Sequence, residues 1–379
     1  MAVSDRKMIP VAAPIIGERE IAYVTDAVRS GWVSSIGPYI DRFEAAFAAY
    51  LGVRHAIAVS NGTVALHLGL HALGVGPGDE VIVPDLTFAA TAHTVLQTGA
   101  VPVLADVSEE TWCLDPRAVE RALTGRTRAV VPVHLFGQPA DLEALLALTA
   151  PRGIRVLEDA AEAHGASVAD GRKAGAVGAL GAFSFYGNKL MTTGEGGMLT
   201  TDDDAVARRC RFLKDHGMSP ERRYFHTELA FNYRMTNLQA ALGLAQLEQL
   251  ETFIEKKRRI MAWYREDLAA VPHLSLNPEP REGRSVYWMI SVVLGDAIAL
   301  SRDEVAARLR ALGVDTRPFF VPMSGLPHLA AARTVGASGE RCPVSQRLSA
   351  RGLNLPSGCG LSREDVARAS AALIEVLGA

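Results

Sequence analysis

Residues 56–73 read AIAVSNGTVALHLGLHAL: a short apolar run, a polar turn and a helical pattern that stops before Gly74. The same order recurs along the first half of the chain, where short, largely apolar runs alternate with amphipathic patterns. The later runs are EVIVP (80–84), VPVLA (101–105), RAVVPV (128–133) and IRVLE (154–158). Such alternation is typical of parallel βαβ units with helices on both faces of the sheet. We therefore predict an α/β fold built on a mostly parallel sheet.

Helical patterns flank this series on both sides. Residues 17–30 place Ile21, Val24, Ala27 and Val28 on one face, and a second pattern covers about 39–51. Much further along, residues 236–270 read as one long helix in which Lys256 to Arg259 form a solvated turn. We expect the helices at 17–30 and 39–51 to form an N-terminal helical segment of the first domain.

Two short strands are expected at GAFSFY (181–186) and GGMLTT (196–201). Their spacing leaves no room for a crossover helix, so at least one of them should be antiparallel or lie at an edge. After the long helix, VYWMISVVL (286–294) reads as a strand and SRDEVAARLRALG (301–313) as a helix. We therefore predict a large domain over 1–250 and a smaller C-terminal α+β domain over 251–379.

The composition excludes several classes of function. The 379 residues hold 39 Lys and Arg against 42 Asp and Glu, a net charge of −3, which argues against a nucleic-acid partner. Four cysteines without CxxC or metal-ligand spacing predict reduced thiols and no metal site. The first residues lack a signal-peptide pattern, and every apolar run is too short to span a membrane. We expect a cytoplasmic protein with no membrane partner.

The βαβ pattern alone would also suit a dinucleotide-dependent dehydrogenase. That class needs a GxGxxG motif between a strand and its helix, and the sequence contains none. Walker P-loop, GxSxG and HExxH motifs are also missing from the sequence. The chemistry must therefore rest on polar residues at strand ends.

Two strand ends carry candidate groups. Ser60-Asn61-Gly62-Thr63 lies at a strand-to-helix turn, where free N–H groups and a hydroxyl can cradle a phosphate. An ordinary helix N-cap is the alternative interpretation. Glu158-Asp159 follows the apolar run IRVL, at the sheet edge where open α/β sheets bind ligands. For Asp159, too, a helix N-cap is the alternative.

A third group is Lys189 in FSFYGNKLMTTGEGG (183–197). The lysine follows an aromatic strand among small residues, and no carboxylate is adjacent in sequence. Such surroundings favour a free amine that can form a Schiff base. A surface lysine is the alternative. Together, a phosphate cradle, a carboxylate at the end of a buried strand and a Schiff-base lysine are what pyridoxal phosphate (PLP) requires.

Taken as a whole, the sequence resembles fold-type I PLP enzymes, and within them the DegT/DnrJ-type nucleotide-sugar aminotransferases. The matching segments are SGWVSSIGPYIDRFE (30–44), SNGTVALH (60–67), GPGDEVIVPDLTFAAT (76–91), VHLFGQPADL (133–142), EDAAEAHGA (158–166), FSFYGNKLMTTGEGGM (183–198) and FNYRMTNLQAALGLAQL (231–247). They cover nearly the whole chain in order. The resemblance implies a large domain whose sheet is of the seven-stranded type.

The resemblance also implies roles for individual residues. Lys189 would bind the cofactor aldehyde and shuttle a proton, and Asp159 would pair with the pyridine nitrogen. Glu162, where many relatives have Gln, would lie near the ring and its 3′ oxygen. Phe88 would stack on the ring face. The phosphate would be held by Gly62, Thr63 and Ser184.

Three further residues are implied to contact the substrate, and one to reach a second subunit. Trp32 and Ser34 lie in a loop that borders the sugar site in the family, and Arg317 lies in a segment beside the nucleotide pocket. Asn232 would reach the phosphate in the neighbouring subunit. The resemblance therefore implies a homodimer with shared active sites, with pairing of dimers into a tetramer left open.

The implied reaction moves the amino group of L-glutamate to a nucleotide-linked keto sugar. GMSPERRY and DTRPFF look most like the branch that aminates GDP-4-keto-6-deoxy-D-mannose at C4 to give GDP-perosamine. Other acceptors stay open: GDP-3-keto-6-deoxymannose, a dTDP-keto sugar or an aminocyclitol ketone. A PLP-dependent sugar dehydrase is a further alternative. A non-catalytic regulator is disfavoured because Lys189 and Asp159 are both present.

Overall fold

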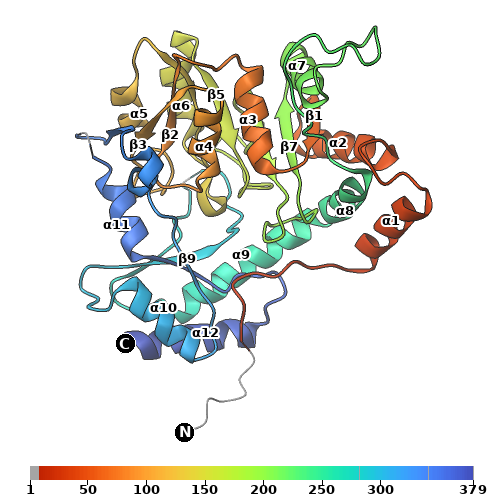
Figure 1. Cartoon of the computed structure of the whole chain (residues 1–379). Coiled ribbons are helices and arrows are strands. Elements are labelled where there is room, and N and C mark those ends of the chain that lie inside the picture. Colours follow the sequence, from red (N-terminus) through yellow and green to blue (C-terminus); the bar gives the residue numbers. More distant parts are fainter. Residues whose placement is uncertain (1–7, 281, 340, 379) are drawn as a thin grey trace.

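A computed structural model describes residues 8–280, 282–339 and 341–378 (Figure 1). The helices are α1 (Glu18–Arg29), α2 (Pro38–Leu51), α3 (Gly62–Ala72), α4 (Ala90–Gln97), α5 (Pro116–Ala122), α6 (Leu142–Thr149), α7 (Asp204–Lys214), α8 (Asn237–Leu247), α9 (Leu250–Asp267), α10 (Arg302–Ala311), α11 (Pro343–Arg351) and α12 (Arg363–Leu377). None of the helices in these ranges is long and apolar enough to cross a membrane.

The strands form two sheets. The large sheet is built, in spatial order, from β1 (His55–Val59), β7 (Gly197–Thr201), β6 (Leu180–Ser184), β5 (Arg155–Asp159), β4 (Thr127–Val130), β2 (Glu80–Pro84), β3 (Val101–Ala105) and β11 (Arg333–Val335). From β6 to β11 all neighbours are parallel, whereas β7 is antiparallel to both β6 and β1. The mostly parallel α/β sheet and the antiparallel strand among 181–201 are thus confirmed.

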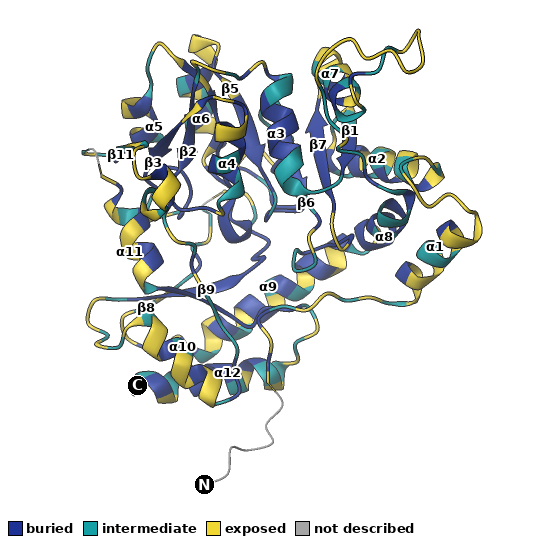
Figure 2. Cartoon of the chain, viewed as in Figure 1, coloured by how far each residue is buried: buried dark blue, intermediate teal, exposed yellow. Residues whose placement is uncertain are grey.

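Helices cover both faces of the large sheet. One face packs a hydrophobic core with α3, α4 and α7, and the other packs a second core with α2, α5, α6 and α8. Figure 2 shows the strands of this sheet buried between the helices. All five positions of β2 (EVIVP) are buried, which suits the apolar run after its first residue; the carboxylate of Glu80 is buried with hydrogen bonds from Thr124 and Arg126.

The smaller sheet is antiparallel, in the order β10 (Arg317–Pro318), β12 (Gly352–Leu355), β9 (Ile290–Leu294) and β8 (Leu274–Leu276). It packs a third core with α9, α10 and α12, to which the early residue Ile9 also belongs. In sequence, β11 lies among these elements, but it adds an eighth strand to the large sheet by pairing with β3. The domain boundary at residue 250 stays a prediction.

Three local expectations are wrong. The long helix over 236–270 is two helices, because Gln249 leaves the helical conformation (φ −115°, ψ 1°) and its amide donates to the carboxylate of Glu20 in α1. Lys256 to Arg259 do lie within a helix, α9, but this turn is not solvated as expected, because Lys257 is buried and only Arg259 is exposed. Finally, the strand expected over 286–294 begins only at Ile290.

Candidate active site

A pocket of about 820 Å³ opens at the carboxyl ends of β5 and β6 and beside the first turn of α3. The predicted site residues that line it are Gly62, Thr63, Phe88, Asp159, Glu162, Ser184, Lys189 and Arg317. These residues come from distant parts of the chain. The structure therefore brings together eight of the eleven predicted site residues.

The turn before α3 is a helix N-cap and also part of the pocket wall. The Asn61 side chain accepts a hydrogen bond from the Val64 N–H at 3.0 Å, as the N-cap interpretation requires. Gly62 packs so closely on the neighbouring strand that a Cβ there would lie 2.6 Å from Cβ of Ser184. Only glycine leaves the Ser184 hydroxyl and the start of the helix open to the same anion.

Asp159 ends β5 at the floor of the pocket and is 6% exposed. Its carboxylate accepts hydrogen bonds from the Thr91 hydroxyl at 2.8 Å and from the Ala161 N–H at 3.2 Å. Burial raises the pKa of this carboxyl group, while the Thr91 hydrogen bond lowers it less strongly. The N-cap alternative is wrong, because no helix begins at Asp159.

Lys189 is largely buried, which contradicts the surface-lysine alternative, and it has a carboxylate partner that the sequence order concealed. Its Nζ donates to Oε1 of Glu162 at 3.3 Å. The other oxygen, Oε2, accepts from the Phe136 N–H at 2.8 Å, so both oxygens of Glu162 are engaged. Burial raises the pKa of Glu162, and the nearby Lys189 ammonium lowers it. Lys189 therefore has no carboxylate next to it along the chain, but it has one next to it in space.

Behind the pocket, Glu158 and His134 form a buried pair at 3.0 Å. Glu158 also accepts from the N–H groups of Gly175 (2.7 Å) and Gly178 (2.6 Å). Burial raises the pKa of Glu158, but the His134 hydrogen bond and charge and these N–H groups together hold it below its usual value. The pair fixes the end of β5, from which Asp159 enters the pocket.

The other three predicted residues lie outside the pocket of their own chain. Trp32 and Ser34 are exposed and are joined to α8 through their carbonyl oxygens, which accept from the side chain and the backbone N–H of Asn237. Asn232 is also exposed, and its side-chain oxygen accepts from Nε of Arg234. A single chain therefore gives these three residues no contact with the pocket.

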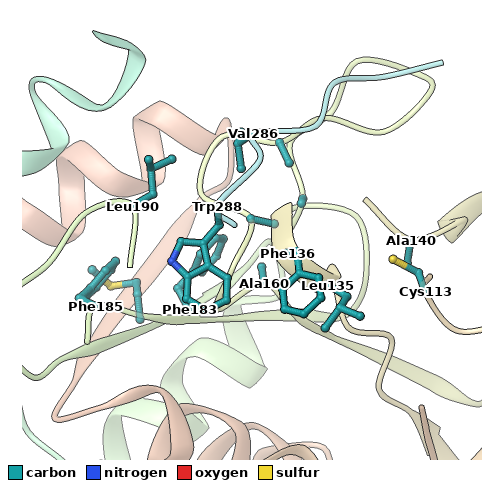
Figure 3. Packing of buried hydrophobic residues seen from close by; sticks show 14 of the residues in the cluster. Cys113, Leu135, Phe136, Ala140, Ala160, Phe183, Phe185, Leu190, Val286 and Trp288 are labelled. Carbon is teal, nitrogen blue, oxygen red and sulfur yellow. The ribbon is translucent and has the colours of Figure 1, made fainter. Parts of the chain in front are cut away.

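Trp288 is a pocket residue that the sequence did not single out. Its indole ring lies with its centroid 3.9 Å from Nζ of Lys189. Figure 3 shows the ring beside Phe136, with which it is stacked at 6.3 Å between centroids. The run VYWMISVVL reads as one apolar strand, so no local signal marked Trp288 as a site residue.

The residues present fit PLP. Phe88 is 59% exposed and lines the pocket, so one face of its ring is free to stack on an aromatic cofactor. Gly62 and Ser184 leave a cradle that a Cβ would fill. Asp159 can hold a proton on a ring nitrogen, because its raised pKa matches a shared proton better than an exposed carboxylate would.

Comparisons with known proteins agree with this geometry. Residues 14–374 match the model of the DegT/DnrJ/EryC1/StrS aminotransferase family. The chain is 45% identical to the GDP-perosamine synthase of Caulobacter vibrioides over 99% of this chain and 100% of that protein. It is 43% identical to the GDP-perosamine synthase of Vibrio cholerae over 95% of this chain and 96% of that protein.

Among solved structures, the PLP form of Spr1654 from Streptococcus pneumoniae superimposes with a TM-score of 0.90 at 25% identity. The superposition covers 98% of this chain and 99% of that one. The chain belongs to the DegT/DnrJ/EryC1/StrS aminotransferase family. It is a PLP-dependent aminotransferase.

Proposed function

We propose that this enzyme transfers the amino group of L-glutamate to GDP-4-keto-6-deoxy-D-mannose and so makes GDP-perosamine. The observation that carries the reaction class is the Lys189 amine, held beside Glu162 in a pocket whose floor is Asp159. The acceptor is supported by the similarity to two GDP-perosamine synthases over nearly the whole chain. The alternatives are GDP-3-keto-6-deoxymannose, a dTDP-keto sugar and an aminocyclitol ketone.

The cofactor, when bound, supplies an electron sink for the bond broken at the substrate carbon. The residues around the cofactor would orient the reacting groups and would hold or move protons. Asp159 would hold the proton of the ring nitrogen, and Nζ of Lys189 would carry a proton from one carbon to the other. Glu162 would orient that amine through the 3.3 Å contact, and Phe88 would cover one ring face.

Anionic groups of the substrates and cofactor need cationic and N–H partners. Gly62, Thr63 and Ser184 would hold the cofactor phosphate. Arg317 lines the pocket, and its guanidinium makes no hydrogen bond or ion pair with another described residue, so it is free to bind a carboxylate or diphosphate. Trp32 and Ser34 would contact the sugar across a subunit boundary.

We further propose a homodimer in which Asn232 reaches the phosphate of the neighbouring subunit. The support is an apolar surface over residues 21–36: Ile21, Val28, Trp32, Val33 and Ile36 are 45–65% exposed. Figure 2 shows this exposure along α1. A second copy of the chain would bury it, whereas a monomer would leave it in water. Whether two dimers pair into a tetramer stays open.

A cytoplasmic location is also a proposal. It is supported by the four cysteines, which are all free thiols in the structure, three of them buried. Thiols without disulfides are typical of a reducing compartment.

The test of the reaction follows the visible absorption of the PLP-loaded protein. Glutamate should bleach the cofactor band, and after desalting, GDP-4-keto-6-deoxymannose should restore it. Lys189→Ala should respond to neither substrate. Lys173→Ala is the matched control, because Lys173 also lies over an aromatic ring, that of Tyr50, but outside the pocket. Bleaching without recovery would keep the reaction class and reject this acceptor.

The dehydrase alternative makes a different prediction in the same assay. A dehydrase would also draw its nitrogen from an amino donor, but it would release that nitrogen as ammonia, so its sugar product would carry no amino group. We expect strict dependence on glutamate, measured as one 2-oxoglutarate released for each amino sugar formed. Release of ammonia together with a sugar product that has gained no amino group would contradict the aminotransferase proposal.

A further inference from the structure

The Lys189 amine has a different partner on each of two sides. Oε1 of Glu162 accepts from Nζ at 3.3 Å, and the ring face of Trp288 lies 3.9 Å from the same atom. Both a carboxylate and an aromatic face attract a cation. This arrangement therefore defines a place for Nζ when it carries a proton.

Trp288 is itself held at both of its ends. Its indole N–H donates to the carbonyl oxygen of Asn188, the residue before Lys189, at 2.8 Å. Its own carbonyl oxygen accepts from Nζ of Lys257 at 2.8 Å. The ring stacks on Phe136 (Figure 3). The Phe136 N–H donates to the far oxygen of Glu162. Trp288 is thus connected through Phe136 to Glu162, the other partner of the Lys189 amine.

Lys257 is an unusual group to find at this place. It lies in α9 and is 3% exposed, and its hydrogen bonds go to two main-chain carbonyl groups, those of Trp288 and Ser357. No carboxylate within the described ranges pairs with it. Burial lowers the pKa of Lys257. An amine buried without a counter-ion is costly, so its two carbonyl contacts must serve the geometry of the segments that they join.

We propose that Trp288, fixed by Lys257, positions the amine of Lys189 for proton transfer in both halves of the reaction. This inference rests on the proposed function. In each half, Nζ takes a proton from one carbon and delivers the same proton to another. The Trp288 ring holds the protonated amine between these two events. Trp288 and Lys257 are positioning residues, since they act through Lys189.

Four variants test this proposal. Trp288→Leu removes the ring, and Trp288→Phe keeps a ring face but loses the indole N–H. Lys257→Met replaces the buried amine with an apolar chain of similar length. Lys256→Met is the matched control, because Lys256 is the preceding residue of α9 but is less buried and outside the pocket.

The measurements are single-turnover rates of both half-reactions and the visible circular dichroism of the bound cofactor. We expect Trp288→Leu to slow the glutamate and sugar halves by the same factor, about tenfold or more, and to change the dichroism. Trp288→Phe should stay within about threefold of the unchanged enzyme, since the ring face is kept. Lys257→Met should slow both halves together, and Lys256→Met should change neither.

Several results would overturn the proposal. If Trp288→Leu slows only one half-reaction, Trp288 is a contact for that substrate. Equal rates for the Leu and Phe variants would show that the aromatic ring face does not position the Lys189 amine. If Trp288→Leu does not fold, Lys257→Met decides, and unchanged rates and dichroism there reject the proposal.

Failure of the proposed function gives a separate signal. If glutamate does not bleach the cofactor band of the unsubstituted enzyme, the proposal that glutamate is the amino donor fails. The dichroism of the Trp288 and Lys257 variants still reports where Lys189 holds the cofactor. An unchanged dichroism in Trp288→Leu would then reject the positioning role independently.

Discussion

His164 is a titratable side chain buried between the rings of Phe183 and Phe185, with centroids 5.6 and 5.7 Å from its own. Burial, aided by the charge of Lys189, lowers its pKa from 6.5 to about 3. In the native state the His164 imidazole therefore stays neutral, whereas in the unfolded chain it takes up a proton below about pH 6.5. Because the unfolded state binds more protons, the free energy of unfolding decreases as the pH is lowered. This group alone accounts for a decrease of about 2 kcal/mol from pH 7 to pH 5.

Replacing His164 with Leu should remove this titration. We expect the loss of unfolding free energy between pH 7 and pH 5 to be about 2 kcal/mol smaller than in the unsubstituted protein. Urea unfolding at both pH values and one protein concentration measures it. A variant that loses as much stability on acidification as the unsubstituted protein would show that His164 does not titrate as described, whatever its stability at pH 7.

At the same scale, the sequence predicted some pocket residues well and others not at all. Asp159 ends β5, and Lys189 lies in the turn region that follows β6, so their places follow from a local pattern. The contact between Lys189 and Glu162 spans 27 positions, and Trp288 lies about a hundred residues from the lysine that it covers. The first contact depends on the pairing of β5 with β6, and the second on how the segment before β9 meets the large sheet. No local pattern contains either.

Among elements, the unit of β1, turn and α3 gives the most direct test of the phosphate cradle. A Cβ on Gly62 would lie 2.6 Å from Cβ of Ser184 and 3.1 Å from its Oγ. Alanine at this position must therefore push the start of α3 away from the end of β6, where Ser184 lies. We expect Gly62→Ala to weaken PLP binding by about tenfold or more, because the cradle closes or shifts. Equilibrium dialysis of the cofactor measures the change.

Gly76→Ala is the control for this prediction. Gly76 lies in the turn between α3 and β2, and a Cβ there would meet nothing within 4 Å. Its cofactor affinity should match that of the unsubstituted protein. Equal affinities for Gly62→Ala and Gly76→Ala would mean that the cradle tolerates a methyl group and that the phosphate lies elsewhere.

The elements also show where periodicity misleads. The strands β2 and β3 and their helices were predictable, because burial on both faces leaves an uninterrupted apolar run. The break between α8 and α9 was not, because the residues on either side continue the helical period. Gln246 and Gln249 both donate to Glu20 of α1, and this contact from more than 200 residues away accompanies the break.

For the whole molecule, the decisive question is which subunit completes which site. Lys189 lines the pocket of its own chain, whereas Asn232 is exposed outside that pocket. If Asn232 serves the neighbouring subunit, Lys189→Ala and Asn232→Asp damage the same site when they are carried by different chains of one dimer. In a mixed dimer, one site then carries both defects and the other carries neither.

We therefore expect mixing to restore activity that each variant alone lacks. Lys189→Ala should be inactive, and Asn232→Asp should be weak, because its carboxylate repels the phosphate. After unfolding and refolding together in equal amounts, half of the dimers would be mixed and one of their two sites intact, giving about a quarter of the full activity. If Asn232 acted within its own chain, no site in any mixed dimer would be whole, and the activity would stay at the average of the two separate variants.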